Sequence, residues 1–320
     1  MVQAVLGIDV GKNKLQVALL LPGKKPKPKV ITNTPEGHQT LLQWLNQTGV
    51  NQVHACLEAT NTYGEAAAEA LHAGGHLVSI VNPARISGFA KSELSRTKTD
   101  KVDAALIARF CAAIRPSLWT PPPPEVKHLQ ALVRRLEALK EMYQQESNRL
   151  ETATAQVSPL IEEHLKYLKQ DIPRTEQLIQ DHFDQHPGLK QQRDLLISIP
   201  GIAQITASLI LAEIVSWKAF ESAKQLAAYI GLTPKERTSG SSVRGRTQLS
   251  RTGNGRLRKA FYMPAVVAKQ HNPIIQAFCQ RLASRGKTPM QIVGAAMRKL
   301  VHIVYGVLKS NCPFDPALAS

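Results

Sequence analysis

The sequence predicts an α/β domain followed by a mainly helical region, and three observations support this fold class. Short apolar strands alternate with amphipathic helices over residues 1–120. Four consecutive prolines at 121–124 predict a stiff, extended linker. After the linker, apolar residues recur at helical spacing. We therefore expect an α/β domain at 1–120, a proline linker with a helical spacer at 121–190, and a basic, mainly helical domain at 191–320.

The first part is expected to form a sheet covered by helices. Strands are predicted at residues 5–10, 15–21, 30–33, 53–58 and 77–81. Helices are predicted at 34–47, 64–73 and 100–113. Because strand hairpins precede an alternation of helices and strands, the pattern predicts a mixed α/β sheet.

The spacer is predicted to form long helices from residue 126 to about residue 186. Pro173 and Pro187 are expected to interrupt them. Few glycines and many Gln, Glu and Lys residues indicate a helical spacer or a coiled-coil pair. The stripe of leucines fits either the core of a bundle or the seam of a dimer, and both remain open. The positions of this stripe are Leu129, Leu132, Leu136 and Leu139.

The basic domain begins with a helix, a tight turn and a second helix over residues 195–214. The turn Ser-Ile-Pro-Gly-Ile at 198–202 indicates a helix-hairpin-helix, which directs backbone N–H groups toward a DNA phosphate. An ordinary tight helical turn is the alternative. Residues 238–255 are rich in Ser, Gly, Thr and Arg and predict a loop or short hairpin. Further helices are predicted at 257–270 and 290–308.

Positive charge is concentrated near the C-terminus. The chain has 320 residues and a net charge of +16, and residues 237–313 contain fourteen Lys or Arg and no Asp or Glu. Such a segment cannot pair its charges internally, which predicts an external polyanion, most commonly nucleic acid. A solvated basic face is the alternative. The residues that we expect to contact nucleic acid are Arg237, Arg244, Arg246, Arg251, Arg256, Arg258 and Lys259.

Other features argue against several classes of protein. A hydrophobic content of 43% and a charged content of 20% fit a folded chain. No apolar run reaches the length of a membrane span, and the N-terminus predicts a strand rather than a signal peptide, so no membrane is expected. Cys56, Cys111, Cys279 and Cys312 form no CxxC pair. This spacing argues against a zinc site or a disulfide framework and fits a cytoplasmic location.

Four carboxylates suggest a metal site. Asp9 and Glu58 each end an apolar strand, where a carboxylate is costly unless it binds a cation or a proton. Asp100 and Asp103 lie three residues apart at the start of a predicted helix, on one side of it. Oxygen ligands favour Mg²⁺ or Mn²⁺, and two such ions support phosphodiester chemistry. Asp100 also fits a helix N-cap, and the motif around Asp9 also opens sugar kinases and other actin-like ATPases.

Several motifs together resemble one known family, the DEDD-type insertion-sequence transposases of insertion sequence family one-ten, with their relatives, the Piv-type DNA invertases. The resemblance runs from Gly7 to about Phe314. The motifs that carry it are Gly-Ile-Asp-Val-Gly-Lys at 7–12, Cys-Leu-Glu-Ala-Thr-Asn-Thr-Tyr at 56–63, Asn-Pro-Ala at 82–84, Lys-Thr-Asp-Lys-Val-Asp-Ala at 98–104 and Ser-Gly-Ser-Ser-Val-Arg-Gly at 239–245.

The resemblance implies a RuvC-like ribonuclease H fold for the first domain, then a coiled coil and a transposase domain. It implies that Asp9, Glu58, Asp100 and Asp103 form the metal site and that Ser239 attacks DNA. Members of the family act as tetramers guided by a structured bridge RNA, with the acids of one subunit facing the serine of another. The resemblance therefore implies target and donor DNA, a bridge RNA and a homo-oligomer, dimer or tetramer, as partners.

These features lead to a mechanistic hypothesis. Ser239 would attack a DNA phosphate and hold the strand as a phosphoserine ester, which a 3′-OH reverses without ATP. A metal ion would assist, and Arg244 and its neighbouring arginines would clamp the phosphate. Ser241 and Ser242 are alternative nucleophiles.

Two other hypotheses remain open. In a metal-dependent junction nuclease, the four acids would activate water and the serine would only bind phosphate. In an architectural DNA- or RNA-binding protein, the nuclease fold would have decayed. His38, His54, His128 and His271 are scattered along the chain, and the sequence assigns them no role.

Overall fold

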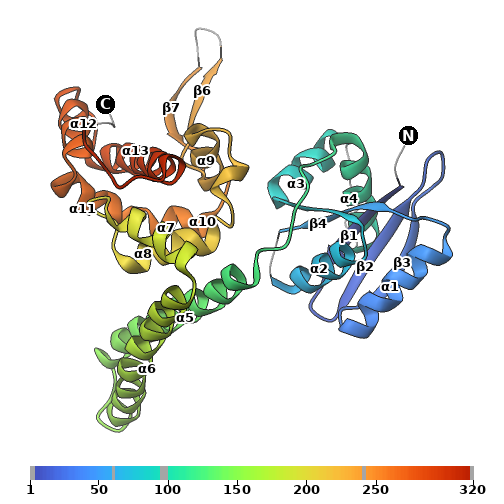
Figure 1. The fold of residues 1–320 in the computed structure, drawn as a ribbon, viewed down its shortest axis with the longest axis horizontal. Coiled ribbons are helices and arrows are strands. Elements are labelled where there is room, and N and C mark those ends of the chain that lie inside the picture. The colour runs from blue at the N-terminus through green and yellow to red at the C-terminus, as the bar shows by residue number, and fades with distance from the viewer. Residues whose placement is uncertain (1–3, 60–61, 94–99, 240–242, 318–320) are drawn as a thin grey trace. The chain divides into compact units, whose positions relative to one another are not determined.

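The computed structural model describes residues 4–59, 62–93, 100–239 and 243–317, with the side chains of 100–101, 236–239 and 243–247 left out. The chain divides into two compact units, Met1–Pro121 and Pro122–Ser320. Figure 1 shows the sheet and its helices in the first unit and the helical second unit. The helices expected as a spacer belong to the second unit.

A five-stranded sheet forms the first unit, with strand order β3-β2-β1-β4-β5. The β1-β2 and β2-β3 pairs are antiparallel, whereas β4 is parallel to β1 and β5 is parallel to β4. The mixed sheet predicted from the sequence is confirmed. The strands are β1 Ala4–Val10, β2 Lys14–Leu20, β3 Lys27–Thr32, β4 Val53–Glu58 and β5 Leu77–Val81.

Helices cover both faces of this sheet (Figure 1). The side chains of α1 and α2 share one core cluster with the sheet, and those of α3 and α4 share another. The sequence did not predict α3, because Asn82-Pro83 was taken only as the end of a strand. Asn82 Oδ1 accepts a hydrogen bond from Ala84 N, so this pair also begins a helix. The helices are α1 Pro35–Gln47, α2 Glu65–Ala73, α3 Pro83–Ser92 and α4 Asp100–Ile114.

The second unit begins with two long helices, α5 (Pro124–Leu150) and α6 (Ser158–Gln185), which pack along each other. Pro173 lies inside α6 and does not interrupt it, so that expectation was wrong. The proline removes one backbone hydrogen bond, but apolar side chains of α6 on both sides of it are buried against α5. Packing of the apolar face therefore keeps the helix continuous.

The rest of the second unit is a helical domain with one hairpin. The sequence did not predict α12 as a separate helix. Asn272 begins it, because its Oδ1 accepts hydrogen bonds from Ile274 N and Ile275 N. The elements are α7 Pro187–Ile197, α8 Gln204–Glu213, α9 Ala223–Ile230, β6 Pro234–Ser239, β7 Val243–Leu249, α10 Gly255–Ala260, α11 Tyr262–His271, α12 Pro273–Ser284 and α13 Pro289–Ser310.

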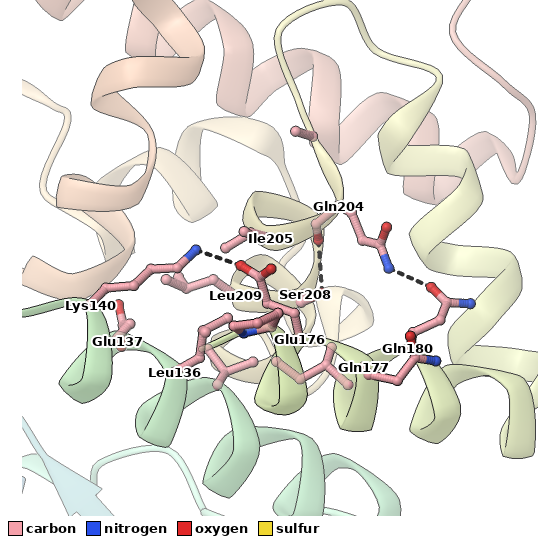
Figure 2. A pocket seen from close by; sticks show the side chains of 14 residues that line it. Leu136, Glu137, Lys140, Glu176, Gln177, Gln180, Gln204, Ile205, Ser208 and Leu209 are labelled. Atoms are coloured by element: carbon pink, nitrogen blue, oxygen red, sulfur yellow. Dashed lines mark hydrogen bonds and ion pairs between the residues drawn. The ribbon is translucent and has the colours of Figure 1, made fainter. Parts of the chain in front are cut away.

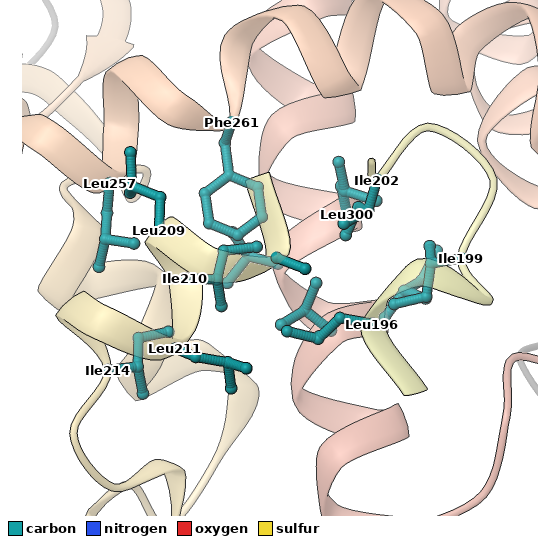
Figure 3. Close-up of a cluster of buried hydrophobic side chains, with 14 of the residues drawn as sticks. Leu196, Ile199, Ile202, Leu209, Ile210, Leu211, Ile214, Leu257, Phe261 and Leu300 are labelled. Carbon is teal, nitrogen blue, oxygen red and sulfur yellow. The ribbon is translucent and has the colours of Figure 1, made fainter. Parts of the chain in front are cut away.

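The helix α13 forms the centre of the core of the second unit. It is long and apolar enough to cross a membrane by length and composition, contrary to the expectation that no segment is. However, 56% of that apolar window is buried inside the protein. Leu300 and its neighbours pack against α7, α9 and α11, so α13 is a core helix (Figure 3).

The turn between α7 and α8 is packed against α11. Ile199 and Ile202 point into the core (Figure 3), and Gly201 has a φ of +107°. A methyl group added at Gly201 would lie 2.8 Å from both Pro264 O and Ala268 Cβ. The turn therefore needs glycine for both its backbone conformation and its close contact with α11.

Between α5, α6 and the start of α8 lies a cavity of about 530 Å³. Figure 2 shows side chains that line it, among which Lys140 and Glu176 form an ion pair and Gln204 donates a hydrogen bond to Gln180. Its described lining contains Glu137 as well as this pair, so acids and bases are mixed around it.

Gly201→Ala tests the role of the α7–α8 turn. We expect it to destabilise the second unit by about 2–5 kcal/mol, because it adds left-handed strain and a backbone clash. Gly188→Ala is the matched control, since a methyl group added there meets nothing within 4 Å. Thermal and urea unfolding of both variants measure the difference, and equal midpoints would contradict the packing described above.

Candidate functional site

Asp9 and Glu58 lie at the same edge of the sheet. The parallel strands β1 and β4 pair Gly7 with Cys56 and Ile8 with Leu57. Asp9 and Glu58 are the next residues of the two strands. They therefore occupy equivalent positions on neighbouring strands, and both are half-buried.

Both carboxylates belong to the face of the sheet that α4 covers. Ile8 and Leu57 lie in the core cluster of α1 and α2, on the opposite face. Because side chains alternate between the two faces of a strand, Asp9 and Glu58 belong to the face that packs against α4.

The backbone of α4 touches the backbone of β1 at Gly7. A methyl group added there would lie 2.1 Å from Ala104 O and 2.3 Å from Ala108 N. Any side chain at this position would push α4 off the sheet. Asp103 directly precedes Ala104, so the close contact at Gly7 determines how near Asp103 comes to the sheet.

The direction of α4 brings its first turn to the same edge of the sheet. Ala104 lies at the level of Gly7, whereas the Cys111 thiol lies 3.8 Å from His54 O, nearer the start of β4. The helix therefore runs opposite to β1 and β4. Its N-terminal end, with Asp103, points toward the strand ends that carry the two acids.

The structure thus brings Asp9, Glu58 and Asp103 to one end of one sheet face. Asp100 is the first residue of α4, and its side chain lies outside the described residues. Within the described part of the chain, no three Asp, Glu, His or Cys side chains are grouped closely enough to hold a metal ion. The donors are all carboxylate oxygens, which fit Mg²⁺ or Mn²⁺.

The predicted nucleophile lies at the tip of a hairpin in the second unit. Ser239 is the last residue of β6 and pairs with Val243, the first residue of β7. Arg244 pairs with Thr238, one position further from the tip. The side chains of Ser239 and Arg244 are outside the described part, as are residues 240–242 with the alternative nucleophiles Ser241 and Ser242. The expected loop or short hairpin is an antiparallel hairpin.

Comparison with known proteins identifies both segments. Residues 6–159 match the IS110-type DEDD family described as transposase, and residues 193–280 match the transposase IS116/IS110/IS902 family. The chain is 35% identical over 318 residues to the pilin gene-inverting proteins of Moraxella bovis and Moraxella lacunata, covering 98% of each chain in both cases. It is 24% identical over 306 residues to the transposase for insertion sequence element IS1328 of Yersinia enterocolitica, covering 83% and 84% of the two chains.

The chain belongs to the IS110 transposase family. The family assignment made from the sequence motifs is confirmed. The first matched segment of this IS110 family member contains all four acids, and the second contains Ser239. The two matched segments therefore include the sheet edge that carries the acids and the hairpin that carries Ser239.

Two of the basic residues predicted to contact nucleic acid form ion pairs within the second unit. Arg256 forms ion pairs with Glu137 on α5 and with Glu213 on α8, the latter at 2.8 Å. Lys259 Nζ lies 2.8 Å from Glu141 of α5 and holds the pKa of that carboxyl below its ordinary value. The expectation that the basic segment cannot pair its charges internally does not hold for Arg256 and Lys259, because folding places acids of α5 and α8 beside α10. The Lys259 side chain is still 76% exposed, and the expected nucleic-acid contacts of both residues remain predictions.

Two further basic residues have defined structural positions. Arg258 Nη1 donates to Ile230 O and to Arg251 O, both at 3.1 Å, and so connects α10 to the segment after β7. Arg251 has a φ of +56°. The side chains of Arg237, Arg244 and Arg246 lie outside the described residues, so their expected contacts remain predictions.

The sequence did not reveal a hydrogen-bonded connection next to the acids. Asn33 Nδ2 donates to Gly11 O and to Tyr63 O, both at 3.0 Å. Gly11 follows Asp9 by two residues, and Tyr63 follows Glu58 by five. Asn33 therefore joins the two loops that leave the acid-bearing strands.

His38 keeps this amide in place. His38 Nε2 lies 2.8 Å from Asn33 Oδ1, and because the amide N–H groups donate to carbonyls, Nε2 must carry the proton. Burial lowers the pKa of His38, which keeps the ring neutral near pH 7. The sequence assigned His38 no role. The position of Asn33, between a strand and the residue Thr34 that caps the next helix, is the sequence feature that could have indicated this connection.

Asn33→Ala tests whether this connection supports the first unit. We expect a loss of about 1–3 kcal/mol of stability, because two loop carbonyls and His38 lose their partner. Asn51→Ala, at an exposed asparagine of the same unit, is the control. Differential scanning calorimetry measures the unfolding temperature of both variants. An Asn33→Ala variant that unfolds at the wild-type temperature would show that the connection does not stabilise the first unit.

Proposed function

We propose that this IS110 family member cuts and rejoins DNA through a covalent serine ester, as the recombinase of a mobile or invertible DNA element. The observation that carries the proposal is the equivalent placement of Asp9 and Glu58 on neighbouring parallel strands, at the end of α4 that carries Asp103. The names of the relatives, pilin gene-inverting protein and transposase, both describe DNA rearrangement.

In the proposed reaction, Ser239 Oγ attacks a DNA phosphorus and loses its proton. The bond between phosphorus and the 3′-oxygen breaks, and the released 3′-oxygen takes up a proton. One phosphodiester is exchanged for another, so a 3′-OH can reverse the step and rejoin strands without ATP. Two Arg residues of β7 at 244 and 246, with Arg237 of β6, would contact the phosphate.

Asp9, Glu58, Asp100 and Asp103 are the proposed ligands of Mg²⁺ or Mn²⁺. When bound, such an ion lowers the pKa of a hydroxyl and neutralises charge that develops on the phosphate. Asp100 and the nucleic acid would complete the set of oxygen ligands around the ion.

We propose that the long helices α5 and α6 join subunits in a homo-oligomer through a coiled coil. Three apolar residues of α6, Leu160, Tyr167 and Leu178, are 68%, 54% and 47% exposed. Their spacings of seven and eleven residues place them along one side of the helix. An exposed apolar stripe of this kind supports contact with a partner helix.

A structured guide RNA and the DNA would share the remaining positive charge. The segment 237–313 contains fourteen basic residues, of which Arg256 and Lys259 are paired with acids of α5 and α8.

We also propose that the α7–α8 turn contacts a phosphate as a helix-hairpin-helix. The first residues of α8 are exposed and carry the orphan N–H groups of a helix N-terminus.

Trapping the covalent intermediate tests the nucleophile. Incubation of the full chain with element-end DNA and Mg²⁺ should yield a protein–DNA adduct that peptide mass spectrometry maps to Ser239. Ser239→Ala should lose the adduct and strand cleavage, whereas Ser241→Ala and Ser242→Ala should keep both. An adduct on another serine would refute the assignment. Cleavage with hydrolysed ends and no adduct would favour the metal-dependent junction nuclease.

Mixing two inactive variants tests whether acids and serine come from different subunits. Asp9→Asn should reduce cleavage by more than about 100-fold, because losing a metal ligand costs at least as much as losing a residue that orients one. Ser239→Ala should reduce cleavage by at least as much, because it removes the proposed nucleophile. If the site forms between subunits, each mixed dimer has one intact site. Random mixing then restores about a quarter of the wild-type sites, because half of the dimers are mixed. A mixture as inactive as its components would show that each subunit uses its own acids.

A further inference from the structure

A second hollow in the second unit lies beside the base of the serine hairpin. Its volume is about 710 Å³, within the range of about 300–1,000 Å³ that small-molecule sites occupy. The first residue of β6 and the last two residues of β7 form one wall. Residues of α12 and α13 form the others, so the whole hollow belongs to one compact unit.

Part of the lining of this hollow is apolar and includes one aromatic ring. Leu249 of β7 packs on α13 at Gly294, where an added methyl group would lie 3.3 Å from Leu249 Cδ1. Phe278 and Leu282 of α12 are half-buried lining residues, and Met290, which also lines the hollow, is 65% exposed. A half-buried ring beside flexible apolar side chains is a surface on which a flat nucleobase can stack.

Another part of the lining is cationic. Arg251, Lys287, Arg298 and Lys299 line the hollow together with His302, and none of its described lining residues is an Asp or Glu. In contrast, the cavity of Figure 2 is lined by acids and bases together. A lining that combines cations with apolar side chains matches a nucleotide, whose phosphates and base need these two surroundings.

A buried polar atom in this wall has no partner among the described residues. His302 Nε2 is inaccessible to solvent and makes no hydrogen bond there. Burial, then the cations of Arg298 and Lys299, lower the pKa of His302, so the ring is neutral near pH 7. His302 therefore adds no positive charge to the lining, and the cations there are Arg251, Lys287, Arg298 and Lys299.

We propose that this hollow binds one unpaired nucleotide of the DNA strand on which the serine hairpin acts, with its base on Phe278 and its phosphates on the cations of the lining. This inference rests on the proposed function. Pro234, in the wall of the hollow, and Ser239 are five residues apart on the same strand, a span of about 16 Å. A strand held at Ser239 therefore reaches the hollow within a few nucleotides.

Binding to bulged duplexes tests the proposal without cleavage. The full chain carrying Ser239→Ala is titrated with three labelled DNA duplexes: one with a single extrahelical 2-aminopurine, one with an abasic residue at that position, and one fully paired. We expect the 2-aminopurine duplex to bind about 5- to 150-fold more tightly than the abasic one, as expected for one stacked base. The fluorescence of 2-aminopurine should fall on binding.

Phe278→Leu in the same background should abolish this preference while keeping an apolar core contact. Tyr262→Leu, which removes an exposed aromatic ring from α11 outside the hollow, is the matched control and should leave the preference intact. Thermal unfolding of both variants establishes that they are folded. The double variant Lys287→Gln/Lys299→Gln should reduce the slope of the logarithm of the binding constant against the logarithm of the salt concentration by about one per lysine. Lys169→Gln on α6 should leave this slope unchanged.

Three results would overturn the proposal. They are equal binding of the three duplexes, a base preference that survives Phe278→Leu, and tighter binding of the equivalent bulged RNA duplex. Its failure is distinguishable from failure of the proposed function, because adduct formation is measured separately with Ser239 present. An adduct without base preference refutes the hollow alone, whereas a base preference without any adduct refutes the serine mechanism alone.

Discussion

The contact between α4 and β1 at Gly7 is the constraint on which the first unit depends. With glycine at this position, the carbonyl of Ala104 approaches the strand more closely than any side chain would allow. The helix also runs opposite to the strand, so its first turn reaches the edge where Asp9 and Glu58 emerge. A carboxylate on a helix and two on strands can then face one region, although they are far apart in the sequence.

Hydrogen bonds of one polar side chain hold the loops that follow these acids. Asn33 hydrogen-bonds to the backbone of the loop after each acid-bearing strand, and His38 holds Asn33. Main-chain carbonyls in such loops need partners when they are partly buried. One amide side chain satisfies two of them and thereby couples the geometry of the two strand ends.

The basic residues of the second unit fall into two groups, according to whether an acid lies beside them. The cations of α10 at Arg256 and Lys259 are paired with acids from α5 and α8, so they attach the hairpin-bearing domain to the long helices. The cations around the hollow beside the hairpin have no Asp or Glu among the described lining residues. Nucleic-acid affinity is therefore expected from the second group and from the hairpin, rather than from the whole basic segment.

The sequence by itself determined the mixed α/β unit, the helical unit after the prolines, and the positions of the acids and the serine. These follow from local pattern: strand alternation, helical spacing and motifs in which neighbouring residues carry the signal. Only the tertiary structure decided which cations are neutralised, because Glu137, Glu141 and Glu213 lie outside the basic segment and meet it through packing. It likewise decided that α6 continues through Pro173 and that Asn33 and His38 connect the loops beside the acids, since burial and long-range contacts outweigh local preference.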